Sequence, residues 1–304
     1  MDINIVNDDE TVGTVLTRRE ALQAAGRYAV LLGSAGAVGS QGQAQSSKIH
    51  MVASPVLTEG PFFVDEKLNR SDLVKGTSRP SVKNGIPLQL SFTIHKLDGN
   101  SHSLLKDVHV DVWHADAIGM YSDENNPMNH EDTSHQTWLR GYQVTDSSGV
   151  VTFKTIFPGW YRGRTPHIHF KVRSYSGSQK VTAEFTSQVF FKDEDAGRIY
   201  QGQPYLGAGE RDTNNHNDNV YNERLSDGSI AGDHMRLDLK KLPGQAGHSA
   251  HFQVALSPQN LRSGNRRQGG PREGGFGGPP PGGFGGPPPG GPGGPPPPPG
   301  GFPL

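Results

Sequence analysis

Apolar and polar residues alternate along several short stretches of the chain, with the period of two that is typical of half-buried β-strands. The clearest stretch is Pro87–Leu97, in which every second residue from Leu88 to Ile94 is apolar. Similar patterns predict six further strands, at Val108–His114, Leu139–Asp146, Val150–Phe157, His167–Tyr175, Glu184–Phe191 and His251–Leu256. Turn sequences such as Asp98-Gly99-Asn100 separate them. Short strands with few helical patterns predict an all-β fold, a two-sheet β-sandwich with long irregular loops.

Three segments do not follow this pattern. Residues 55–63 form an arm punctuated by Pro and Gly, and residues 123–137 are polar and rich in His and Asn, as expected of a loop. Residues 193–223 combine Asp, Asn, Gly and aromatic residues without a period, which predicts an irregular region containing one short helical turn.

The composition changes at both ends of the chain. Residues 259–304 consist mainly of Gly and Pro and repeat the motif GGFGGPPP, which predicts a disordered tail because little apolar surface is available to bury. Glycine does not occupy every third position, so the tail is not collagen-like. In the leader, residues 1–47, Arg18-Arg19 precedes a weakly apolar stretch and small residues up to Ala44, similar to a twin-arginine signal. We therefore expect an exported protein, periplasmic or extracellular, with one domain at residues 48–258.

Charge and cysteine content exclude several classes of function. The formal net charge of −1 gives no indication of nucleic-acid binding, and no apolar run approaches the ~18 residues of a membrane span. The chain contains no cysteine, which rules out disulfides, thiolate metal sites, cysteine nucleophiles and a cysteine–tyrosine crosslink.

The segment PGWYRGRTPHIHF, residues 158–170, concentrates the candidate chemistry. His167 and His169 are two residues apart in a predicted strand, so both imidazoles face the same side of the sheet. Such a pair is either simply packed in the sheet or half of a metal site.

Two tyrosines favour the metal site. Tyr121 follows the second predicted strand and Tyr161 lies just upstream of the histidines, giving a set of two phenols and two imidazoles. A free phenol has a pKa near ~10, so only a strongly Lewis-acidic ion ionises it at neutral pH. Fe(3+) meets this demand better than zinc or magnesium. Copper radical oxidases use similar ligands but need a cysteine, which is missing here.

Four motifs of the chain resemble those of the intradiol ring-cleavage dioxygenases, the catechol 1,2- and protocatechuate 3,4-dioxygenases. They are TEGPFF at 58–63, VDVWHADAIGMYS at 110–122, the long segment at 139–170 and SQVFF at 187–191. The short spacing between Arg162 and His167 resembles the exported subgroup of this family.

The resemblance implies a reaction and a role for each matching residue. Tyr121 and Tyr161 would be the equatorial and axial tyrosinate ligands of Fe(3+), and His167 and His169 the imidazole ligands. Arg164 would stabilise negative charge on the bound substrate, and Gln188 and Tyr161 would complete the catalytic group. The implied reaction cleaves a catechol-type aromatic diol with O2 and gives a muconate-type dicarboxylic acid.

Three other functions remain open. An exported β-sandwich could bind an aromatic or carbohydrate polymer without turnover, the same cluster could hold zinc in a hydrolase, and the chain could be a structural protein with a sticky Gly/Pro tail. In the dioxygenase interpretation, we expect the pocket to be lined by residues 58–63, by Asp116–Met120 and by the loop after Phe191, with Phe62 and Phe63 as an aromatic wall. The remaining candidates, Arg140 and His114, are expected to have structural roles.

Overall fold

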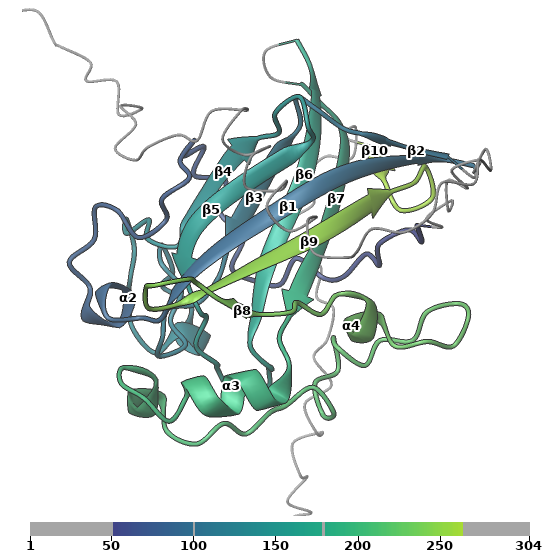
Figure 1. The fold of residues 1–304 in the computed structure, drawn as a ribbon. Coiled ribbons are helices and arrows are strands. Elements are labelled where there is room, and N and C mark those ends of the chain that lie inside the picture. The colour runs from purple at the N-terminus through teal and green to yellow at the C-terminus, as the bar shows by residue number, and fades with distance from the viewer. Residues whose placement is uncertain (1–50, 100, 178–179, 264–304) are drawn as a thin grey trace, which may run out of the picture. The chain divides into compact units, whose positions relative to one another are not determined.

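The computed structural model describes residues 51–99, 101–177 and 180–263. The predicted leader and the tail from residue 264 lie outside the described residues. Figure 1 shows a β-sandwich of two twisted sheets, as the alternating pattern predicts.

The first sheet is built around β1 (Pro87–Asp98). Strand β9 (His248–Leu256) pairs in parallel with one edge of β1, and β8 (Lys240–Lys241) continues the sheet beyond it. Strands β5 (Val150–Ile156) and β2 (Ser101–Leu104) follow one another, both antiparallel, along the other edge of β1.

The second sheet is antiparallel throughout, with the order β10-β7-β6-β3-β4. Its strands are β3 (His109–Trp113), β4 (Arg140–Val144), β6 (His167–Ser176), β7 (Lys180–Phe190) and β10 (Arg262–Ser263). Because β10 pairs with β7, the folded part of the chain continues five residues beyond the boundary predicted at 258.

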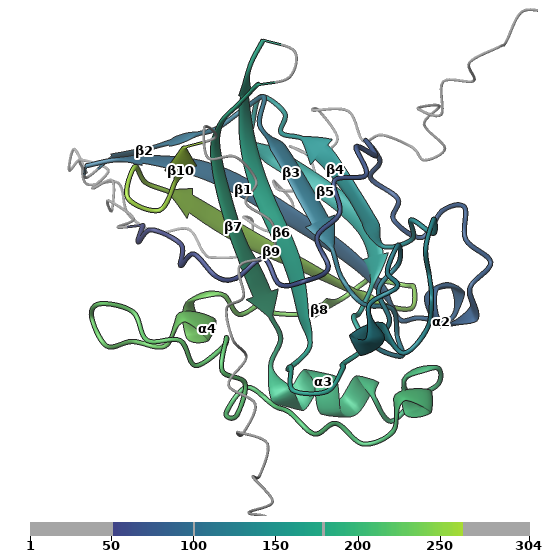
Figure 2. The same cartoon turned by 180° about the vertical axis from the view of Figure 1, so that it is seen from behind.

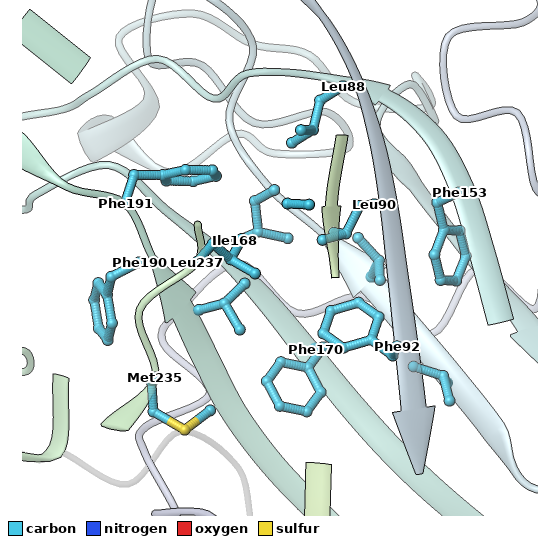
Figure 3. Close-up of a cluster of buried hydrophobic side chains, with 14 of the residues drawn as sticks. Leu88, Leu90, Phe92, Phe153, Ile168, Phe170, Phe190, Phe191, Met235 and Leu237 are labelled. Atoms are coloured by element: carbon cyan, nitrogen blue, oxygen red, sulfur yellow. The ribbon is translucent and has the colours of Figure 1, made fainter. Parts of the chain in front are cut away.

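The core lies between the two sheets and is made of the inward-facing residues of the alternating pattern. In Figure 3, Leu90 and Phe92 of the first sheet face Ile168 and Phe170 of the second, and the rings of Phe92 and Phe170 are 4.9 Å apart between centroids. All four are fully buried. The fold class predicted from the sequence is therefore confirmed.

Helices are few and short, and none that the described residues form is long and apolar enough to cross a membrane. They are α2 (Pro80–Lys83), α3 (Asp193–Ile199), α4 (Ala231–His234) and the 3-10 helices η1 (Pro127–Asn129) and η2 (Tyr205–Ala208). Figure 2 shows α3 at the end of the sandwich where β7 ends and β6 begins. The predicted irregular region at 193–223 thus contains a seven-residue α-helix as well as a helical turn.

The outer face of the second sheet is polar yet buried. On β6 it carries His167, His169, Lys171 and Arg173, all less than 10 % exposed. An N-terminal arm, residues 51–70, passes over this face (Figure 2). Phe63 packs on Trp113 at 4.8 Å between ring centroids, Lys171 lies 3.9 Å from the Phe63 ring, and Asp65 bonds Arg173 at 2.9 Å. The arm converts an outer face into a second, polar interior.

Candidate metal centre

Tyr121, Tyr161, His167 and His169 converge at the end of the sandwich near α3. The Nε2 atoms of His167 and His169 are 3.1 Å apart, and the Tyr161 hydroxyl is 3.2 Å from Nε2 of His167. The Tyr121 ring centroid lies 5.7 Å from that of Tyr161 and 6.2 Å from that of His169. The structure therefore brings together all four side chains that the sequence analysis selected as metal ligands.

Strand register positions the two imidazoles. His169 pairs with Trp113 of β3 on one side and with Gln188 of β7 on the other. The Trp113 indole stacks on the His169 ring at 4.9 Å with an interplanar angle of 9°. Nδ1 of His167 donates to the Thr165 carbonyl oxygen at 2.6 Å, which leaves its Nε2 lone pair free for a cation.

The two phenols differ in their surroundings. Tyr121 is 1 % exposed and its ring stacks on Phe62 at 4.3 Å, whereas Tyr161 is half-buried. Among the described residues the Tyr121 hydroxyl finds no hydrogen-bond partner of acceptable geometry, although the Tyr161 phenol lies close enough to affect its pKa. Burial raises the pKa of Tyr121 well above its ordinary value, and the Tyr161 phenol raises it further. Burial also raises the pKa of Tyr161.

These residues fit a strongly charged cation. Burial lowers the pKa of His167 and His169 well below their ordinary values, and the Arg164 charge lowers both further, so the imidazoles are neutral and able to bind a metal. Donor atoms 3.1 and 3.2 Å apart suit neighbouring ligands of one ion with bonds of ~2.1 Å. The described part of the chain holds no group of three or more His, Cys, Asp or Glu suited to a metal, so an ion bound by these two imidazoles would need the phenols as its further ligands.

Arg164 lies against this group, and each of its three guanidinium nitrogens has a polar neighbour. Its Nε donates to Asp218 Oδ2 at 2.9 Å and its Nη2 donates to Gln188 Oε1 at 2.5 Å. Its Nη1 lies 3.4 Å from Nε2 of His167 and 3.5 Å from the Tyr161 hydroxyl. Gln188 is held in turn by donating to the Thr58 carbonyl oxygen at 2.7 Å. Arg164 and Gln188, the two predicted catalytic residues besides Tyr161, are thus fixed beside the four candidate ligands.

Sequence reasoning missed Asp218. Its carboxylate is fully buried and accepts from Arg164, from the Thr165 main-chain N–H at 2.8 Å and from the N–H groups of Val220 and Tyr221 at 2.8 Å. Asp218 lies in residues 193–223, which have no hydrophobic periodicity. The sequence there does not distinguish Asp218 from the neighbouring Asp and Asn residues.

The segments that carry the two tyrosines touch main chain to main chain. Gly159 N–H donates to the Asp116 carbonyl oxygen at 2.9 Å. A Cβ on Gly119, which has φ +88°, would lie 2.1 Å from the Trp160 carbonyl oxygen, and one on Gly159 would lie 2.4 Å from the Asp116 carbonyl oxygen. Glycine at both positions allows the tyrosine segments to approach each other.

The remaining candidates have structural contacts. His114 is buried and its Nε2 lies 2.6 Å from the Thr155 hydroxyl, while Arg140, 2 % exposed, donates from Nη1 to the Phe62 carbonyl oxygen at 2.6 Å. The 58–63 arm lies at the site as expected, since a Cβ on Gly60 would be 3.2 Å from the His169 ring. Phe62 lies against both tyrosines, with its ring centroid 5.9 Å from that of Tyr161.

Comparison with known proteins gives consistent matches. Residues 58–196 match the family described as Dioxygenase. The chain is 25 % identical over 160 residues to a chlorocatechol 1,2-dioxygenase of Cupriavidus pinatubonensis and 27 % identical over 166 residues to one of Pseudomonas putida. These alignments cover 47 % and 48 % of this chain, and 57 % and 56 % of those relatives. The chain therefore spans little more than half the length of these relatives.

One solved structure matches over nearly its whole length. The intradiol ring-cleavage dioxygenase from Tetranychus urticae has a TM-score of 0.55 and 27 % identity, over 68 % of this chain and 96 % of that one. Sequence and fold together place the sandwich among the dioxygenases. Residues 58–196 therefore belong to the intradiol ring-cleavage dioxygenase family, with distant similarity to the chlorocatechol 1,2-dioxygenases.

Proposed function

We propose that the protein is an Fe(3+)-dependent enzyme that cleaves a catechol-type diol with O2 between its two oxygenated carbons. The observation that carries this proposal is the convergence of Tyr121, Tyr161, His167 and His169 beside the Arg164 guanidinium. Both oxygen atoms of O2 enter the product, a muconate-type dicarboxylic acid, so the reaction balances without another oxidant or reductant.

When bound, ferric iron would hold both substrate oxygens and withdraw electron density from the ring, which makes a ring carbon reactive toward O2. A catechol must lose two protons to bind in this way. Tyr161 is the phenolate best placed to take one of them, because it is the more exposed of the two tyrosines and belongs to a surface turn.

Arg164 supplies a fixed positive charge. A guanidinium stays protonated at all relevant pH values, so it can stabilise negative charge on the substrate without transferring a proton. Asp218 and Gln188 hold Arg164 on two sides, so its position requires no rearrangement during the reaction. Phe62 and the Trp113–His169 stack limit access of water from the sheet side.

The function is tested by metal content, colour and oxygen uptake. Purified protein with stoichiometric iron is expected to be reddish from tyrosinate-to-iron charge transfer, and to consume O2 with catechol, protocatechuate or hydroxyquinol while forming a ring-opened product. Colourless protein that contains stoichiometric iron would contradict phenolate ligation. Zinc instead of iron would favour the hydrolase, and coloured protein without O2 uptake would favour a binding role.

Two variants assign the ligands. Tyr121→Phe and His167→Ala are each expected to lose the visible band and to lower kcat at least ~10³-fold, since each removes one donor of the set. Two matched controls should keep colour and activity. Tyr175→Phe lies on β6, the strand that carries His167, but at its far end, and His102→Ala lies on exposed β2. Retained activity in Tyr121→Phe or His167→Ala would remove that residue from the ligand set.

A further inference from the structure

Two buried side chains hold the main chain of Tyr121. The Asn129 side chain accepts from the Tyr121 N–H at 2.7 Å and donates to the Tyr121 carbonyl oxygen at 2.9 Å. The Thr133 hydroxyl donates to the same carbonyl oxygen at 2.6 Å. Asn129 is 1 % exposed and Thr133 is fully buried. Both main-chain groups of Tyr121 are thus fixed by what we name the Tyr121 clamp, Asn129 and Thr133.

The clamp belongs to residues 123–137, the polar segment whose sequence predicts a loop. The loop closes on itself, because Glu124 and Thr133 exchange main-chain and hydroxyl hydrogen bonds and the Asp123 N–H donates to the Thr133 carbonyl oxygen at 3.0 Å. Asn129 also donates to the Thr133 hydroxyl at 3.1 Å, so the two members of the clamp support each other.

An ion-pair chain joins this loop to the other end of the Tyr121 segment. Arg79 bonds Glu131 of the loop at 2.9 Å and buried Asp116 at 2.6 Å. The other oxygen of Asp116 accepts from the N–H groups of Ile118 and Met120 at 3.0 and 2.9 Å. The segment is therefore anchored at both ends, at Asp116 and at Tyr121 itself.

The Tyr121 ring is fixed as well. It stacks on Phe62 with an interplanar angle of 22°. Arg140 links Phe62 to Ser122, the residue after Tyr121, because it donates to the Phe62 carbonyl oxygen at 2.6 Å and to the Ser122 carbonyl oxygen at 3.0 Å. Moving the main chain of Phe62 away from that of Ser122 would break hydrogen bonds of a buried arginine, which leaves charge-assisted hydrogen bonds unmade.

Tyr161 has no comparable anchor among the described residues. Its carbonyl oxygen accepts from the Arg164 N–H at 3.1 Å, within its own turn. The next residues are Arg162, whose side chain is 92 % exposed, and Gly163, at φ +81°. One tyrosine is held by the molecular interior and the other by a surface turn.

We propose that Asn129 and Thr133 are positioning residues that keep Tyr121 as the fixed tyrosine ligand, so that the unequal anchoring decides which tyrosine yields to substrate. This inference rests on the proposed function, since it concerns the same site. In this proposal, the contacts of the Tyr121 main chain decide which tyrosine substrate displaces, and the chemical properties of the two phenols do not.

The test compares two substitutions at one position. Thr133→Val removes the hydroxyl but keeps the shape, and Thr133→Ser keeps the hydroxyl. We expect Thr133→Val to retain iron, to shift the charge-transfer band and to lower kcat about tenfold, as small displacements of a catalytic group do. Thr133→Ser should lie within about twofold of wild type in the band intensity and kcat. Ser134→Ala is the neighbouring control, because the Ser134 hydroxyl donates to exposed Asp132.

Resonance Raman spectra with anaerobic substrate give a readout that a merely structural role would not move. The tyrosinate signal of Tyr161 is the one that the Tyr161→Phe variant lacks. In wild type, substrate should remove this signal and leave the Tyr121 signal intact. In Thr133→Val, substrate should weaken both signals. If Thr133→Val does not fold, Asn129→Asp is used, because it keeps the acceptor for the Tyr121 N–H and loses the donor to its carbonyl oxygen.

The outcomes separate the two proposals. One outcome is that wild type is coloured and active and that Thr133→Val or Asn129→Asp has the same spectrum and kcat as wild type. This outcome would overturn the positioning role and leave the enzymatic function intact. Substrate-induced loss of only the Tyr161 signal in these variants would also overturn it. Wild type that binds no iron, or shows no charge-transfer band, would instead overturn the proposed function.

Discussion

At the scale of single residues, the candidate ligands could be predicted because their spacing fixes their orientation. His167 and His169 are two residues apart in a strand, so they face the same side wherever that strand lies in the fold. Their spacing alone is therefore sufficient to predict that the two imidazoles lie together. Asp218 and Asn129 could not be found in this way. Asp218 meets Arg164 across 54 positions of the sequence, a separation that no local pattern encodes.

His114 shows how a buried imidazole can influence stability without taking part in the reaction. Its Nδ1 lies 2.8 Å from the Ala115 carbonyl oxygen, so Nδ1 donates there and Nε2 accepts from Thr155. Burial lowers the pKa of His114 from 6.5 to about 4. The folded protein thus binds fewer protons at this residue than the unfolded chain does between these two pH values, and stability falls as the pH falls through this range.

We predict that His114→Gln removes this pH dependence. The wild-type free energy of unfolding should fall by about 3 kcal/mol more than that of the variant between pH 6.5 and pH 4, since each pKa unit corresponds to ~1.4 kcal/mol. Urea unfolding of both proteins at several pH values, with equal iron content, measures this difference. Parallel stability curves would mean that His114 is not buried as a neutral ring.

At the scale of elements, strong alternation predicted the seven longer strands, and weak or missing alternation explains the differences. Strand β2 is exposed along its whole length, so no apolar face marks it. Strands β8 and β10 have two residues each, too few for any period. Helix α3 begins with three acidic residues, a usual start signal, but has one buried residue, Ala196, and therefore no apolar stripe.

The contact between the two tyrosine segments leads to a prediction for Gly119. Gly119→Ala adds a methyl group against the Trp160 carbonyl oxygen and also demands a left-handed backbone from alanine. We expect a loss of about 2–5 kcal/mol in the free energy of unfolding, combining overpacking with backbone strain, together with weaker iron retention. Denaturant titration and iron analysis after dialysis measure both effects.

Gly76→Ala is the matched control, because Gly76 has φ +84° but nothing within 4 Å of the added Cβ. It should cost only the backbone strain, about 1–2 kcal/mol, and leave iron retention unchanged. Equal losses in the two variants would show that the tyrosine segments can separate without penalty.

At the scale of the molecule, the N-terminal arm makes a polar sheet face into an interior. Arg173 is central to this arrangement, since it bonds Asp111 of β3 at 2.6 Å and Asp65 of the arm at 2.9 Å. The sequence predicted an irregular arm at residues 55–63 only, and no local pattern indicates that residues 51–70 cross the sheet. That arrangement depends on pairing between residues more than 100 positions apart.

We predict that Arg173→Met loosens the arm. Removing one partner leaves Asp111 buried without its counter-ion, which should cost about 3–5 kcal/mol of stability. Limited proteolysis should then cut within residues 51–70 faster than in wild type. Arg198→Met, which removes an exposed ion pair with Asp195, should change stability by less than ~1 kcal/mol and leave the cleavage rate unaltered. Unchanged proteolysis of Arg173→Met would show that the arm is held without this ion pair.

The arm also sets an order of events during synthesis. Asp65 leaves the ribosome 108 residues before Arg173, a delay of roughly 5–20 s at ~5–20 residues per second. Throughout that interval Phe62 and Phe63 have no complete sheet to pack against, so their exposed rings are a binding site for chaperones. In the proposed enzyme, the metal could bind only after β6 has emerged and the arm has docked, so its site would be completed long after residues 51–70 have been made.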